Sequence, residues 1–68
     1  MNAGLFAITI EEQIAEVERE LKLREHVYPR WVGEKKMRQE KADKCMAAMR
    51  AVLETLQSIK EKTNVSAT

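Results

Sequence analysis

Side chains that could carry out a reaction are few in this chain. It contains one cysteine, Cys45, and one histidine, His26. A cysteine becomes a nucleophile when a neighbouring base or positive charge stabilises its thiolate, and no base stands at a spacing from Cys45 that would do this. We therefore expect Cys45 to be a small apolar residue of a helix seam, and His26 to lie at the surface near the end of a helix.

The same two residues limit metal and cofactor chemistry. A single cysteine excludes a disulfide within the chain, and one cysteine with one histidine falls short of the four ligands of a structural zinc site. No glycine-rich loop that cradles a phosphate is present. We expect no enzymatic activity, no cofactor, no metal and no small-molecule substrate.

Residues suited to binding are concentrated between positions 24 and 38. Two of the three aromatic side chains, Tyr28 and Trp31, lie in this segment together with several Arg and Lys residues. Tyr, Trp and Arg are enriched at binding hot spots because they combine a large rigid surface with a polar group. The predicted partner-binding residues are Arg24, Tyr28, Arg30, Trp31, Lys35, Lys36 and Arg38.

Charge is unevenly distributed along the chain, although 12 basic and 11 acidic residues nearly balance. Residues 1–21 contain five acidic residues and one basic residue, whereas residues 22–44 contain eight basic and four acidic ones. A hairpin that turned near residue 30 would have an acidic open end and a basic turn end. The basic end is either a binding surface or an ordinary solvated face, since three acidic residues are interleaved in it.

Composition indicates which elements must position these residues. Charged residues make up 34% of the chain and aromatic residues 4%, a mixture typical of long helices. The apolar runs are far shorter than the roughly 18 residues that a membrane-spanning helix needs, so we expect a cytosolic protein without a membrane segment. A chain of 68 residues forms one domain at most and is near the lower limit for folding alone.

A first helix is predicted over residues 10–28. Thr9 and Glu12 have capping-box spacing, in which the Thr hydroxyl accepts from the Glu backbone N–H and the Glu carboxylate accepts from the Thr N–H. Apolar positions then recur alternately four and three residues apart, which is the spacing of a coiled-coil seam. The seam positions are Ile10, Ile14, Val17, Leu21, Arg24, Tyr28 and Trp31. Because Tyr28 and Trp31 fall on the seam, they belong to the core, to a binding interface or to both.

A turn and a second helix follow. Pro29 has no N–H and disfavours helical geometry at Tyr28, so we expect the first helix to end or kink near Val27 and Tyr28 and a turn to occupy residues 29–36. Gly33 is expected to release the chain from this turn. The second helix is predicted over residues 37–62. Its seam positions are Ala42, Cys45, Met49, Val52, Leu56 and Ile59, with Met46 and Leu53 widening the stripe.

Two short segments flank the hairpin. Residues 1–9 form an apolar N-terminal arm with Leu5, Phe6 and Ile8, and residues 63–68 form a small polar tail. The arm either caps the open end of the hairpin or contacts a partner, and both alternatives stay open.

These elements predict an all-α fold, an antiparallel two-helix hairpin of coiled-coil type over residues 10–62. Two helices alone bury too little apolar surface to offset the entropy cost of ordering the chain, so we expect a homodimer in which two hairpins form a four-helix bundle. Arg24 interrupts the apolar seam and is expected to pair with Glu20 or Asp43. The arrangement of the two hairpins in the dimer stays open.

Three motifs carry a resemblance to other proteins. The string VYPRWV at residues 27–32 is followed by the pattern M-x-x-E-K-A and then by A-x-M-x-A-V-L-x-T-L. With these motifs, residues 16–56, about 60% of the chain, resemble a group of small proteins encoded in bacteriophage and prophage genomes of proteobacteria. The matching residues are Glu18, Arg24, Val27, Tyr28, Pro29, Arg30, Trp31, Val32, Met37, Lys41, Ala42, Met49, Ala51, Val52, Leu53 and Leu56. Lys35 stands where such relatives are expected to have glycine.

The resemblance implies a phage context and the cytoplasm of a bacterial host, without a mechanism. The leading hypothesis is a phage-encoded, non-enzymatic homodimer that binds a host protein and inhibits or redirects it. Such a host protein would be a regulator, a motility or secretion ATPase, or a defence factor. Two alternatives stay open: a nucleic-acid-binding accessory or regulatory protein that uses the basic turn end, and a structural component of a phage assembly.

Overall fold

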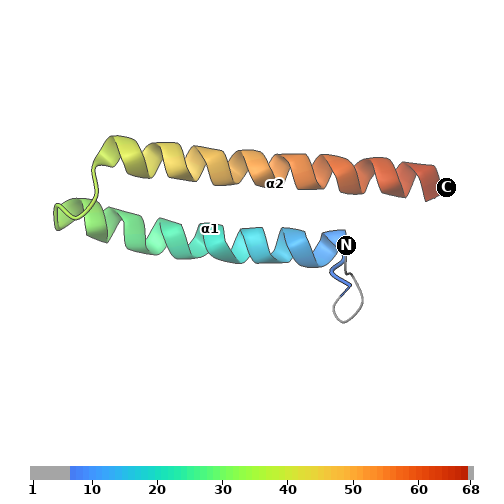
Figure 1. The fold of residues 1–68 in the computed structure, drawn as a ribbon, viewed down its shortest axis with the longest axis horizontal. Helices are drawn as coiled ribbons and strands as arrows, with labels where there is room; N and C mark the ends of the chain where they lie inside the picture. Colours follow the sequence, from blue (N-terminus) through green and yellow to red (C-terminus); the bar gives the residue numbers. More distant parts are fainter. Residues whose placement is uncertain (1–6, 68) are drawn as a thin grey trace.

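The protein is a hairpin of two long helices. The structure, a computed structural model, describes residues 7–67, so Leu5 and Phe6 of the predicted arm lie outside the described residues. Helix α1 spans Ile10–Gly33 and helix α2 spans Gln39–Ala67. They lie side by side and run in opposite directions (Figure 1). No strand occurs in the described part of the chain. The predicted all-α antiparallel hairpin is confirmed.

Helix α1 begins with the capping box expected from Thr9 and Glu12. The Glu12 N–H donates to Thr9 Oγ1 at 3.0 Å, and the Thr9 N–H donates to Glu12 Oε1 at 3.1 Å. Two backbone donors at the start of the helix are thereby satisfied, and the carboxylates of Glu11 and Glu12 lie at the positive end of the helix dipole. Local sequence is therefore sufficient to start α1 at Ile10.

Helix α1 does not end before Pro29 as expected. It runs through the proline to Gly33, and the turn occupies residues 34–38 rather than 29–36. The proline costs the helix one hydrogen bond, because it has no N–H to donate to the carbonyl one turn earlier. The last turn persists because Val32 is half-buried in the hairpin and because the following residues satisfy its free carbonyls.

The end of α1 is closed by a Schellman motif that contains lysine where glycine is usual. The Lys36 N–H donates to the Trp31 carbonyl at 2.8 Å, and the Lys35 N–H donates to the Val32 carbonyl at 3.0 Å. This pair of hydrogen bonds requires a left-handed residue just after the helix. Lys35 adopts that conformation with φ of 62°, whereas Gly33 stays helical. The expected release of the chain at Gly33 is wrong, because it occurs at Lys35.

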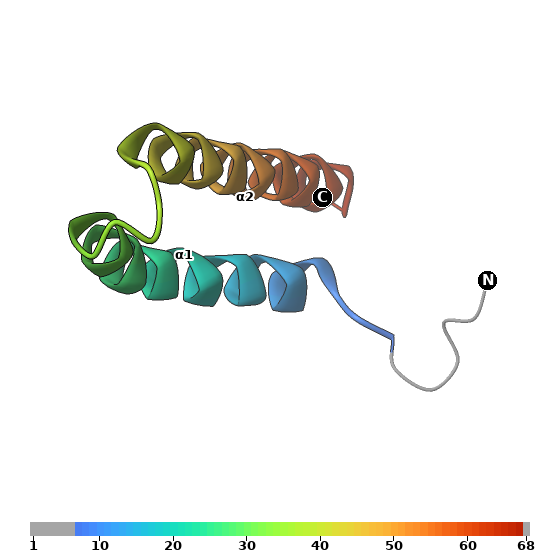
Figure 2. The same cartoon turned by 60° about the vertical axis from the view of Figure 1, so that its left-hand side comes forward.

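The two helices bury little apolar surface between them. Among the described side chains, only Ile14, Leu21 and Ala42 are buried hydrophobic residues. The half-buried residues along the seam are Ile10, Val17, Arg24 and Tyr28 on α1, and Cys45, Met46, Met49, Leu53 and Leu56 on α2. Figure 2 shows α1 and α2 as a single layer. Within the described residues, no other element covers either broad face of the hairpin.

The stripe that α2 turns toward α1 differs from the expected seam at two of its six positions. Met46 and Leu53, expected only to widen the stripe, are half-buried, whereas Val52 and Ile59, expected in the seam, are exposed. Periods of 3.5 and 3.6 residues diverge along a straight helix, so the spacing defines a broad stripe without selecting the part that meets the neighbouring helix. As a result, α2 has a second apolar edge through Val52 and Ile59 that α1 does not cover.

The left-handed lysine gives a test of the turn. Replacing Lys35 by Gly should raise the free energy of unfolding by about 0.5–1 kcal/mol, because glycine adopts a positive φ without the clash of a Cβ atom. Urea denaturation followed by circular dichroism measures the change. The control is Lys36→Gly, which should lower stability, since Lys36 does not have a positive φ. Equal effects of the two substitutions would contradict the Schellman geometry.

Candidate binding surface at the turn end

Arg24 is held between the two helices by two hydrogen bonds. Its Nε donates to Glu20 Oε1 at 2.9 Å, and its Nη1 donates to the backbone carbonyl of Cys45 on α2 at 3.2 Å. The hydrogen bond to Glu20 raises the pKa of Arg24 above its usual value. Only 23% of the Arg24 side chain is exposed. The predicted pair with Glu20 is confirmed. Asp43, the other expected partner, instead accepts a hydrogen bond from Gln39.

Three of the predicted binding residues form one cluster near the end of α1. The guanidinium carbon of Arg24 lies 5.8 Å from the ring centre of Tyr28, within the range of cation–π attraction. The ring centres of Tyr28 and Trp31 are 5.8 Å apart and their planes are tilted by 36°, which suits an aromatic pair. Tyr28 is half-buried and Trp31 is exposed. The cluster therefore runs from the seam between the helices to the surface.

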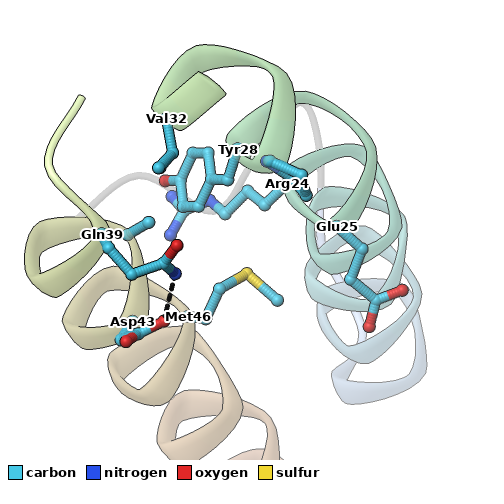
Figure 3. A pocket seen from close by; sticks show the side chains of 9 residues that line it. Arg24, Glu25, Tyr28, Val32, Gln39, Asp43 and Met46 are labelled. Carbon is cyan, nitrogen blue, oxygen red and sulfur yellow. Dashed lines mark hydrogen bonds between the residues drawn. The ribbon is translucent and has the colours of Figure 1, made fainter. Parts of the chain in front are cut away.

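An open cleft of about 260 Å³ lies between the helices beside Arg24 and Tyr28 (Figure 3). Its lining residues are Arg24, Glu25, Tyr28, Pro29 and Val32 on α1, and Gln39, Ala42, Asp43 and Met46 on α2. In Figure 3, the side chains of Tyr28, Gln39 and Met46 converge on the cleft from the two helices. A largely apolar surface with a few polar groups at its edge is typical of sites that accept a side chain or a small ligand.

The other four predicted binding residues are exposed cations around the turn. Lys35, Lys36 and Arg38 line a shallow depression at the turn, and the Nζ of Lys36 is 3.2 Å from Glu34 Oε1. Arg30 is exposed on the last turn of α1 and lines neither this depression nor the cleft. Within the described residues, no ion pair is formed by Arg30, Lys35 or Arg38. These three charges are therefore available to an acidic partner.

Sequence reasoning missed the α2 wall of the cleft. Gln39, Asp43 and Met46 are spaced four and three residues apart, so they share one side of the helix. This spacing could have grouped them, but it could not show that their side of α2 faces Tyr28. That relation depends on the rotation of α2 about its own axis, which the apolar pattern does not determine.

The residues with reactive side chains lie away from any ligand cluster. Cys45 is half-buried and His26 is exposed. Among the described residues, no three His, Cys, Asp or Glu side chains are grouped closely enough to hold a metal ion. No helix in the described part of the chain combines the length and the apolar character that crossing a membrane requires.

Comparisons with known proteins add no relative: no family model matches the chain, and no curated protein or solved structure does so either. The class is therefore defined by fold and surface alone. It is a two-helix hairpin whose turn end has an aromatic and basic surface beside a cleft between the helices.

Arg24 gives a test of how the two helices are joined. Replacing Arg24 by Met should lower the free energy of unfolding by about 1–2 kcal/mol, because the hydrogen bonds to Glu20 and to the Cys45 carbonyl are lost. Arg19→Met is the control, since the pair of Arg19 and Glu16 is exposed and joins residues of one helix. The control should change stability by less than about 0.5 kcal/mol. If both variants unfolded at the same urea concentration, the proposed tie between the helices would be wrong.

Proposed function

We propose that this chain is a phage-encoded, non-enzymatic protein that binds a protein of the bacterial host and inhibits or redirects it. The phage context in this proposal is supported by the resemblance of residues 16–56, with the VYPRWV motif, to small phage and prophage proteins. The observation that carries the binding role is the cleft at the turn end, where Tyr28 and Arg24 occur together with Arg30, Lys35 and Arg38, three exposed cations that form no ion pair among the described residues. A regulator, a motility or secretion ATPase and a defence factor are the classes of host target in this proposal.

Rigidity of the turn end favours binding. Arg24 is fixed by Glu20 and by the Cys45 carbonyl, and Tyr28 packs against its guanidinium. The backbone of the turn is fixed by the Schellman hydrogen bonds of Lys35 and Lys36. A surface that is ordered before binding loses less conformational entropy on association, so more of its contact energy appears as affinity.

The chemistry of the turn end indicates what it would bind. A cleft of about 260 Å³ has room for one bulky apolar side chain of a partner. Lys35 and Arg38 line the depression at the turn, which shares Val32 and Gln39 with the cleft, and they form no ion pair among the described residues. Acidic groups next to that side chain would meet these two charges at this rim of the cleft. We infer a target segment that presents an apolar side chain flanked by Asp or Glu.

The proposed active form is a homodimer in which two hairpins build a four-helix bundle. Its support is the small core of the single hairpin, which buries only Ile14, Leu21 and Ala42 among the described hydrophobic residues. Such a core is small for a stable domain, and covering the exposed apolar edge of α2 with a second hairpin would enlarge it.

A second candidate function is nucleic-acid binding, which a specific observation favours. Arg30, Lys35, Arg38, Lys41 and Lys44 are exposed around the turn end, and no ion pair involves any of them within the described residues. Nucleic-acid binding driven by these charges would weaken steeply with salt, because it depends on the release of counterions from phosphates.

Charge reversal at the rim tests the host-protein proposal. The double variant Lys35→Glu, Arg38→Glu should lose a host protein that the native chain captures from nuclease-treated lysate of the bacterial host, because its rim would repel acidic groups. Circular dichroism should show unchanged helicity, since both side chains are exposed. Lys36 is left in place because it pairs with Glu34.

The matched control carries the same change in charge away from the turn. Lys22→Glu, Lys60→Glu alters two residues that neither line the cleft nor form an ion pair among the described residues, and it should capture the same host protein. Equal loss in both double variants would mean that net charge, and not the turn end, decides binding. Capture that depends on intact nucleic acid and disappears at moderate salt would support the second candidate instead.

A further inference from the structure

A second apolar groove lies at the open end of the hairpin, far from the cleft. It is lined by Ile8, Val17, Val52 and Leu56, with Glu12, Gln13 and Glu16 at its edge, and its volume is about 500 Å³. Val52 is 45% exposed there. The groove has room for a bulky apolar side chain, and acidic groups border it.

Trp31 is the exposed apolar side chain at the other end of the same face. Val17, Arg24 and Trp31 are each seven residues apart, so they lie along one edge of α1. Cys45 and Val52 are likewise seven apart on α2. Val17 and Val52 line one groove, and Arg24 bonds to the Cys45 carbonyl, so the two edges run side by side. Trp31, 40% exposed, continues this face at the turn end.

Another row of residues on α1 has a charge pattern that would pair with the same row of a second, antiparallel copy. Glu16, Leu23 and Arg30 are also spaced by seven, and Leu23 is 48% exposed. If a second α1 packed antiparallel against this row with Leu23 at the two-fold axis, each Glu16 would lie opposite an Arg30. The same axis would bring each Trp31 over the groove at Val17, because the midpoints of the two pairs, residues 23 and 24, are adjacent and differ by about 1.5 Å along the helix.

The opposite orientation is electrostatically unfavourable. Two hairpins with their turn ends together would bring the basic residues 30–44 of one copy beside those of the other. Their acidic open ends, with Glu12 and Glu16 at the groove, would also meet. Like charges repel and opposite charges attract across an interface, so the charge pattern selects the antiparallel arrangement.

We propose that the occupant of the open-end groove is Trp31 of a second copy of this chain. Two hairpins pack antiparallel, with Leu23 of each copy at the two-fold axis, Trp31 of each in the groove of the other, and Arg30 beside Glu16. The inference rests on the proposed homodimer and specifies its interface. It leaves the cleft lined by Tyr28, Gln39 and Met46 on the other side of the seam, open to a host protein.

Trp31 reports on its own environment, because it is the sole tryptophan of the chain. Its fluorescence emission should shift to shorter wavelength as the protein concentration rises through the dimer dissociation constant, which sedimentation equilibrium measures on the same samples. Val52→Glu should abolish the shift by placing a carboxylate in the groove. Ala51→Glu is the control, since the neighbouring residue is exposed and does not line the groove. A shift retained in Val52→Glu would overturn the assignment of Trp31 to the groove.

Substitutions along the self-complementary row test the two-fold axis. Leu23→Glu should weaken the dimer at least about tenfold, because two carboxylates would be brought together at the axis. Arg30→Glu alone and Glu16→Arg alone should each weaken it about three- to tenfold, and the combined variant should recover native affinity within about twofold. Loss of the exposed Glu16–Arg19 pair within one chain cannot explain such a recovery. Absence of recovery would overturn the pairing.

Spin labels separate this arrangement from its alternatives. With Cys45→Ala to remove the native thiol and Lys36→Cys to carry the label, electron-spin distance measurement should give about 35–45 Å in the antiparallel dimer, from helical rise alone. A dimer with labels closer than about 25 Å would overturn the arrangement while leaving the proposed homodimer intact. A folded monomer at micromolar concentration would overturn both, and host-protein capture would remain a separate question.

Discussion

The guanidinium of Arg24 connects helix α1, helix α2 and the aromatic pair at the turn end, and the arrangement of the hairpin depends on these contacts. It lies on the seam, where a charge without partners would be costly, and it is satisfied by Glu20 on its own helix and by the Cys45 carbonyl on the other. These hydrogen bonds fix the lengthwise position of α2 against α1. The same group lies over Tyr28, which in turn packs against Trp31. The Arg24 guanidinium thus contributes both to the register of the hairpin and to the arrangement of its turn end.

The main constraint on the fold is how little two helices can bury. A single layer of two helices has one seam, and the apolar stripe of α2 is wider than α1 can cover. The edge through Val52 and Ile59 is left in water for this reason. An exposed apolar edge on a small chain is a candidate binding surface, because the hydrophobic effect favours any partner that covers it. The proposed dimer follows from that geometry, and its orientation follows from the separation of acidic and basic residues along the chain.

The two proposed functions, dimerisation and binding of a host protein, are therefore assigned to opposite sides of the seam. The side with Val17, Trp31 and Val52 is apolar at one end and aromatic at the other, which suits a second copy of the same chain. The other side carries the cleft at Tyr28 and Met46, bordered by polar groups. In the proposed arrangement, self-association and partner binding would use separate surfaces and would not compete.

Sequence alone determined the parts of this protein that depend on local chemistry and on period. The capping box at Thr9 and Glu12, the presence of two antiparallel helices and the pairing of Arg24 with Glu20 all follow from residues three or four apart or from the repeat of apolar positions. These features need only neighbouring residues, so spacing predicts them.

Tertiary structure decided those features that local conformational preferences disfavour and those that they do not determine. Pro29 disfavours helix, yet α1 continues because the turn that follows it packs in the hairpin and is closed by the Schellman hydrogen bonds. Lys35 takes a left-handed conformation that its Cβ disfavours, because the chain must reverse there. The rotation of α2, which exposes Val52 and builds the cleft wall, was fixed only when the two helices met, since a broad apolar stripe allows several rotations of nearly equal burial.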